Sequence, residues 1–202
     1  TQPPGWSLGL TSAKSAHKPR NLILQIIGDQ PTGKRHYEVV ASGLHLELNR
    51  PYYVGCAVHV AADGVAKATF YVRDLVDAAG SLRTSERPVT VASGVTAPLP
   101  IVVGGRHAND RHRWDGLLDE VRITTAPGQL LPLARGGEEP AAALPDQTLL
   151  AHWTFDDPAA PLADAGGSDR SLVPLAARPL VDAPLIDFAH VLLNSNEFLY
   201  VD

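Results

Sequence analysis

Charged side chains interrupt an apolar stretch that has the length and alternation of a β-strand, GLLDEVRIT at 116–124. Alternation places Glu120 and Arg122 on one face of that strand and Asp119 on the other. A charge on a half-buried strand must be paired, hydrogen-bonded or bound to an ion. In one interpretation, Asp119 or Glu120 supplies oxygen ligands to a calcium ion. In the other, which we favour because its partners are already in the sequence, Arg122 pairs structurally with Glu120 and Asp119 accepts backbone amides.

A second polar cluster precedes this strand, in the loop GGRHANDRHRWDG at 104–116. Sugar recognition needs an aromatic face for the pyranose ring, together with amides, carboxylates or guanidinium groups for its hydroxyls. Five residues of the loop would meet that need and are the candidate ligand-binding residues: His107, Asn109, Asp110, Arg113 and Trp114. A contact with a protein, or a solvated hairpin tip, fits the same composition. A transition-metal site is disfavoured because HANDRH lacks a standard ligand spacing.

The acidic loop DDPAAPLADAGGSDR at 156–170 offers a further set of oxygen ligands. Asp156 and Asp164, with Asp119 of the strand above, are the candidate calcium ligands. The loop does not follow the spacing of the helix–loop–helix calcium motif, and an acidic surface loop is the favoured interpretation. Calcium is therefore the one cofactor that the sequence suggests.

Motifs for catalysis are missing from the sequence. A retaining glycosidase places two carboxylates ~5 Å apart, and no expected strand carries such a pair of glutamates. We find no GxSxG, no HExxH and no Gly-rich phosphate loop before a helix. We expect the protein not to be an enzyme.

Composition excludes several further classes. The net charge of −5 argues against a nucleic-acid binder, which needs a basic face. No apolar run approaches the roughly 20 residues of a membrane span, and we see no signal peptide in this chain. The single cysteine, Cys56, lies in an apolar run and is expected to be a buried, inert thiol.

The chain reads as many short strands separated by turns, which is typical of an antiparallel sandwich. Strands are expected at 6–12, 21–29, 36–42, 44–48, 52–60, 68–75, 89–93, 99–105, 116–124 and 149–155, with loops between them that include 77–88 and a hairpin through Asp63-Gly64. Helical spacing of apolar residues predicts one C-terminal helix at 184–196. We divide the chain into a core at 1–125, a Pro/Ala-rich linker or strap at 126–147, and a final part at 148–202 packed on the same domain.

The order of these strands resembles a known family, the laminin-G-like, concanavalin-A-like jelly roll. The strongest motif is aromatic-x-Gly-x-x-Asp-Glu-Val-Arg-Ile, carried here by Trp114, Gly116, Asp119, Glu120, Val121, Arg122 and Ile123. The resemblance covers about 5–125. The family's opening motif, an apolar-Trp-x-Phe-Asp strand and an acidic Gly-containing loop, is found at 149–172, after the part that it should precede. The resemblance implies an all-β, antiparallel two-sheet jelly-roll sandwich, permuted or trimmed, with one C-terminal helix.

A second resemblance covers the tail at 187–202, which is similar to the end of an uncharacterised C-terminal domain of large planctomycete proteins, with Ala189 where a cysteine is usual. Together the two imply a module of an extracytoplasmic bacterial protein. Three explanations fit the displaced opening motif: a permuted and trimmed jelly roll, a chain cut from a longer protein, or edge strands supplied by a neighbouring protomer. We expect a non-catalytic module that binds polysaccharide or a partner protein through edge loops. A structural accessory domain is the alternative, and a degenerate glycoside hydrolase is a weaker one. Open sheet edges would also allow a homo-oligomer.

Overall fold

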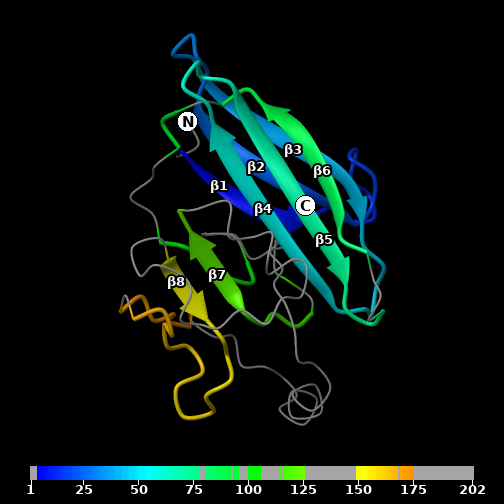
Figure 1. Ribbon diagram of the computed structural model, residues 1–202, viewed down its shortest axis with the longest axis vertical. Helices are drawn as coiled ribbons and strands as arrows, with labels where there is room; N and C mark the ends of the chain where they lie inside the picture. The colour runs from blue at the N-terminus through cyan, green and yellow to red at the C-terminus, as the bar shows by residue number, and fades with distance from the viewer. Residues whose placement is uncertain are drawn as a thin grey trace.

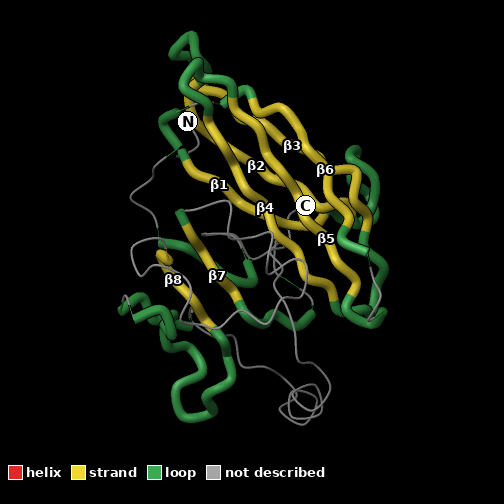
Figure 2. The backbone as a smooth tube through the Cα atoms, in the orientation of Figure 1, coloured by secondary structure: helices red, strands yellow, loops and turns green. Residues whose placement is uncertain are grey.

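The structure of the protein is a computed structural model, which describes residues 4–77, 81–91, 93–95, 100–105, 114, 116–125, 149–167 and 169–174. Within these residues every regular element is a β-strand, and eight strands form three antiparallel sheets without a helix (Figures 1 and 2). The expectation of an antiparallel all-β protein is thus confirmed. The helix expected at 184–196 and the linker expected at 126–147 lie outside the described residues.

The first sheet has the order β1-β2-β3, from β1 (Gly5–Leu10), β2 (Asn21–Asp29) and β3 (Arg35–His45). Its central strand, β2, is apolar along most of its length and is buried on both faces. The strand expected at 36–42 and the first two residues of the strand expected at 44–48 join into the single strand β3, whereas residues 46–48 form no strand. Gly43, at φ +79°, provides the left-handed residue that lets the chain pass between the two expected strands without a turn.

The second sheet has the order β4-β5-β6, from β4 (Tyr52–Val60), β5 (Ala66–Asp74) and β6 (Arg83–Val89). The hairpin between β4 and β5 is confirmed: Gly64 has φ +82°, and Asp63 Oδ1 accepts the Val65 amide at 3.0 Å. The loop expected at 77–88 is wrong over β6, because the polar sequence RTSERPV forms a strand. Its two arginines, Arg83 and Arg87, have hydrogen-bond partners outside their own sheet.

Those partners lie on β3, and they join the two sheets along one edge. Arg87 donates from Nη2 to the Ser42 carbonyl at 2.8 Å, and Ser85 Oγ donates to the same oxygen at 2.6 Å. At one end of the seam, Glu38 of β3 accepts the Thr90 amide and hydroxyl, both at 2.8 Å. We call this β3/β6 side the closed edge.

One hydrophobic core lies between the two sheets, an arrangement compatible with a sandwich. Side chains from every strand of both sheets contribute to it. Its buried members are Leu10, Leu22, Leu24, Ile26, Val40, Leu46, Tyr52, Val54, Ala66, Ala68, Phe70, Val72, Val89 and Val91. Gly28 of β2 is needed because a side chain there would collide with the Ser93 carbonyl and the Val91 side chain.

The third sheet pairs β7 (Val121–Thr124) with β8 (Leu149–Trp153), with Val121 opposite Trp153 (Figure 1). The strand expected at 116–124 is therefore shorter, and residues 100–105 form no strand. Near the end of residues 100–105, the Gly104 carbonyl accepts the Trp114 amide at 2.9 Å.

Candidate functional site

A half-buried polar cluster stands where β7 begins. Glu120 Oε2 lies 3.1 Å from Arg122 Nη2 and 2.8 Å from His152 Nε2 of β8. The two members of the expected structural pair are thus brought together. Sequence reasoning missed His152, because its position opposite Arg122 follows only from the β7–β8 register.

The protonation of His152 follows from its neighbours. Its Nε2 also lies 3.0 Å from Arg122 Nε, and one ring nitrogen cannot accept from the guanidinium and donate to the carboxylate at once. A carboxylate only accepts, and a short bond to a charged group is the stronger of the two. We therefore assign the proton to Nε2, with His152 donating to Glu120.

Glu120 is held in an unusual backbone conformation, with φ +54°. The strand begins one residue later, and Asp119 Oδ1 accepts the Glu120 amide at 3.1 Å. Burial opposes the charged form of Glu120, but the hydrogen bonds and positive charge of His152 and Arg122 outweigh it and lower the pKa of this carboxyl. A carboxylate with two donors and a lowered pKa is a weak base. The cluster is suited to fastening β7 to β8 rather than to moving protons.

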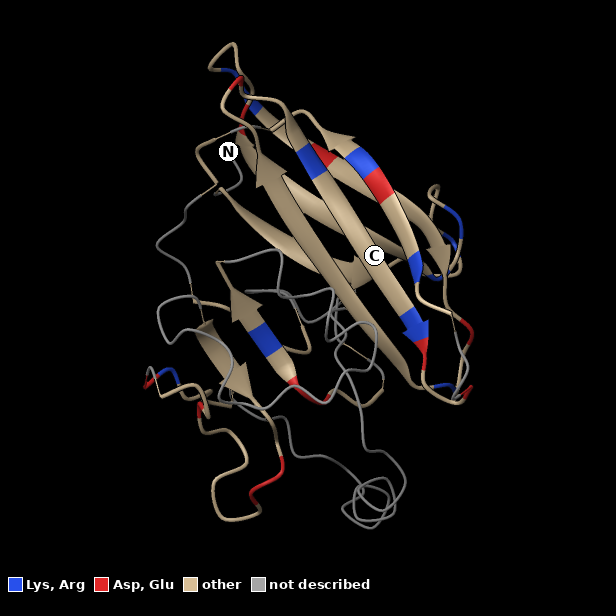
Figure 3. Cartoon of the chain, in the orientation of Figure 1, with Lys and Arg blue, Asp and Glu red and all other residues tan. Residues whose placement is uncertain are grey.

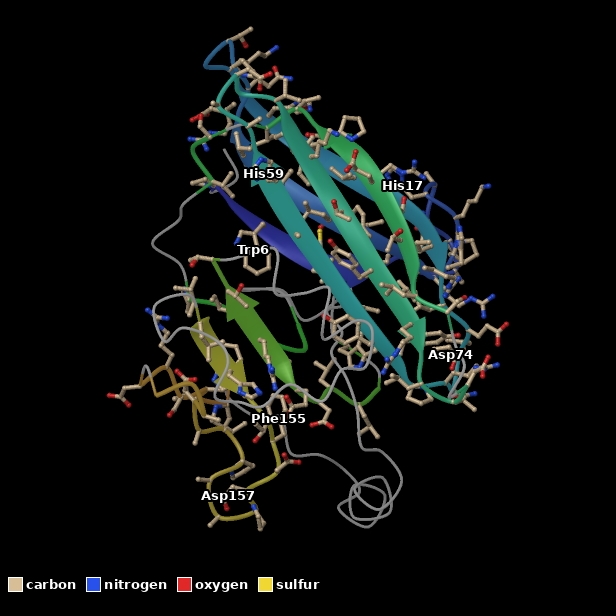
Figure 4. The ribbon with its side chains drawn as sticks, in the orientation of Figure 1. Trp6, His17, His59, Asp74, Phe155 and Asp157 are labelled. Atoms are coloured by element: carbon tan, nitrogen blue, oxygen red, sulfur yellow. The ribbon has the colours of Figure 1, made fainter. Side chains whose placement is uncertain are left out.

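Asp164 fastens the acidic loop to the same sheet. Its Oδ1 accepts the amides of His152 at 3.0 Å and Gly166 at 2.9 Å, and its Oδ2 accepts the Arg170 amide at 3.2 Å. Asp156 lies apart from it on the exposed part of the loop (Figure 4 shows the neighbouring Phe155 and Asp157). The candidate calcium ligands Asp119, Asp156 and Asp164 are not brought together. In the described residues no group of three or more His, Cys, Asp or Glu side chains could hold a metal ion.

Trp114 is the one of the five candidate ligand-binding residues that the structure describes. His107, Asn109, Asp110 and Arg113 lie outside the described residues. The indole of Trp114 lies against Gly116, and it packs on the core cluster together with Leu118. The side chain is therefore partly buried against the core, and it is not a free stacking platform.

A surface that sequence reasoning did not identify lies opposite the closed edge. Trp6 of β1 is in register with the core residue Ile26, so it lies on the face of its sheet that carries the core, yet it is 49% exposed. Val58 and Val60 of β4 also face the inside, opposite Ala68 and Ala66, and are 39% and 46% exposed. Such positions are normally covered.

The reason is that the two sheets approach along β3 and β6 but not along β1 and β4. Figure 4 shows Trp6 beside β4 rather than under it. We call the surface formed by Trp6, Val58 and Val60 the open edge. The signal that could have found it is the lack of charge in GWSLGL and YYVGCAVHV, the sequences of the two strands.

No helix among the described residues is long and apolar enough to cross a membrane. Comparison with protein-family models, with curated proteins and with solved structures finds no match to this chain.

Proposed function

We propose that the protein is a non-catalytic interaction module that docks a partner polypeptide through the open edge, as an accessory part of an extracytoplasmic protein. The observation that carries this proposal is the exposure of Trp6, Val58 and Val60, three residues that face the inside of the sandwich. An exposed apolar surface at such positions is characteristic of a binding site. Burial of a Trp and two Val side chains would supply several kcal/mol toward association.

In its finer classification we propose a permuted laminin-G-like jelly roll. Support comes from the third sheet, where the opening-like sequence LLAHW of β8 pairs with the closing-like sequence VRIT of β7. Two motifs that are displaced from each other in the sequence therefore share a sheet, as expected if both belong to one domain.

Polysaccharide binding is the alternative outcome, and the experiment is designed to separate the two. The full chain would be screened against a random-peptide display library and, in parallel, against a glycan array in calcium and in chelator. Trp6→Ser is the test variant. Leu48→Ser is its matched control, because Leu48 is an exposed apolar residue (71%) beyond the end of β3, away from the open edge.

We expect enrichment of apolar peptides that bind the parent chain and the Leu48→Ser variant but are lost with Trp6→Ser. Glycan binding that Trp6→Ser leaves intact would replace the proposal with a lectin-like function located elsewhere. If a folded sample that is monomeric under the screening conditions binds neither library, the proposed function is wrong.

A further inference from the structure

The four sheet edges of the sandwich differ in charge. β3 and β6, at the closed edge, contain Arg35, Glu38, Arg83, Glu86 and Arg87, and β6 also contains Pro88. β1 and β4, at the open edge, contain no Asp, Glu, Lys, Arg or Pro (Figure 3). Edge strands that must stay unpaired normally carry such residues or a bulge. β4 has neither, since its register with β5 is uninterrupted.

The free backbone groups of β4 belong to the same residues as its exposed side chains. At the two ends of the β4–β5 ladder, Leu75 donates to the Pro51 carbonyl at 3.1 Å and Ala61 donates to the Val65 carbonyl at 2.8 Å. Bonded and non-bonded residues alternate along an antiparallel pair. The odd-numbered residues from 51 to 61 therefore bond to β5, and Val58 and Val60 direct their N–H and C=O groups away from it. No other described strand pairs with β4.

These features specify the ligand of the open edge. It must be an extended segment, so that its backbone can bond to Val58 and Val60. It must be uncharged, because β1 and β4 offer no charge to pair with. It must carry an apolar side chain at every second position, to cover Val58, Val60 and Trp6 on the inside of the sandwich.

The β4 strand of this chain itself meets all three requirements. Its inward-facing residues Val54, Cys56, Val58 and Val60 are all apolar, and it has nine residues without a charge. We propose that the open edge binds a second copy of this chain, the two β4 strands pairing antiparallel about a two-fold axis at His59, so that Val58 of each copy lies opposite Val60 of the other. This inference rests on the proposed function, since it names the partner of the same surface. Pairing of this kind joins two three-stranded sheets into one and brings each pair of valines against its equivalents.

The oligomeric state of the full chain tests the proposal. Sedimentation velocity would be run from about 1 to about 300 µM, the range in which a small strand-addition interface associates. Val60→Lys places a charge at the pairing site. Val65→Lys is the matched control, because Val65 is similarly exposed (54%) but belongs to the hairpin turn. We expect a monomer–dimer equilibrium in the parent and in Val65→Lys, weakened about tenfold or more in Val60→Lys.

Amide hydrogen exchange followed by NMR separates strand addition from any other dimer. The amides of Val58 and Val60 should exchange quickly in dilute samples and slowly in concentrated ones, whereas those of Ala57 and His59, bonded to β5, should be protected in both. A dimer without this concentration-dependent protection would overturn the strand-addition geometry. A chain that stays monomeric throughout would overturn the second copy as partner, and the peptide screen would then decide the proposed function on its own.

Discussion

Replacing Glu120 by glutamine should destabilise the protein by about 1.5 kcal/mol at neutral pH. The carboxylate accepts hydrogen bonds from His152 at 2.8 Å and Arg122 at 3.1 Å. A buried hydrogen bond to a charged group contributes about 1.5–3 kcal/mol, whereas an exposed ion pair contributes about 0–1. Side-chain exposures of 32% for Glu120, 19% for Arg122 and 13% for His152 place the cluster between these limits. Glutamine keeps an acceptor but loses the charge, so the expected loss is one such bond rather than two.

The effect should depend on pH in one direction. The pKa of Glu120 is lowered in the folded protein, by His152 and Arg122 against the opposing effect of burial. The unfolded chain therefore binds a proton at higher pH than the folded one does. The stabilisation is present above the pKa of the unfolded chain and is lost as the pH falls through the folded value. Parent and Glu120→Gln should therefore converge in stability once the pH has fallen below the lowered folded pKa of Glu120.

Urea unfolding, followed by tryptophan fluorescence and far-UV circular dichroism, measures this difference. Trp153 is a suitable probe because it is buried and lies opposite Val121 in the third sheet. With a slope of roughly 2–3 kcal/mol/M, the midpoint should fall by roughly 0.5 M at pH 7. Glu86→Gln is the matched control: its 2.7 Å pair with Lys67 is more than half exposed, and the midpoint should barely move. A Glu120→Gln midpoint equal to the parent's at pH 7, or a difference that persists in acid, would refute the assignment.

Three further predictions concern the core and the loops. Burial raises the pKa of the Cys56 thiol to about 12. Its reaction with a disulfide reagent at about pH 8 should therefore be slower in the native chain than in urea by on the order of a thousandfold. Equal rates would mean that the thiol is accessible in the native chain. Gly28→Ala forces a methyl group against the Ser93 carbonyl. It should lower the free energy of unfolding in urea by about 3 kcal/mol. An unchanged free energy of unfolding would show that the backbone at Ser93 can move away from β2. Asp164→Ala removes the acceptor of three backbone amides, including that of His152, and should cost about 2 kcal/mol; thermal unfolding with and without calcium would also show whether Asp164 supports an ion.

The sequence predicts those parts of the fold in which local pattern and tertiary packing agree. β2 and β4 match their expected ranges, 21–29 and 52–60, because each is a continuous apolar run between turn residues. β6 could not be found in this way. Its inward-facing residues Arg83, Ser85 and Arg87 would suit a loop on local grounds, and they form a strand only because β3 presents carbonyl oxygens to them. A partner that lies 38 or more residues away leaves no trace in a local pattern.

The candidate site likewise has parts that the local sequence predicts and parts that depend on tertiary contacts. The proximity of Glu120 and Arg122 is expected from their spacing of two residues, although the strand begins only at Val121 and Glu120 has a positive φ. The position of the third member of the cluster, His152, depends on the pairing of β7 with β8, and the role of Trp114 depends on the core cluster against which it packs. The sequence pattern predicts that Trp114 is a surface residue of a polar loop. Its placement on the core comes from the bond of its amide to Gly104, a contact that no periodicity encodes.

The proposal that the open edge is a binding surface is supported by the order of residues in two rows, each of which runs across the strands of one sheet. In the first sheet, Trp6, Ile26 and Glu38 lie in one inward-facing row. In the second, Val58, Ala68 and Arg87 do the same. If exposure to water alone decided the order of residues in each row, the charged residue would lie at the open edge. An inward-pointing charge at that edge would also prevent unwanted strand pairing. Each row has the opposite order, with its charge at the closed edge and its apolar residue at the open one. An apolar row end in contact with water is stabilised only when a partner covers it. The arrangement is therefore the one expected of a sandwich edge that binds a further strand.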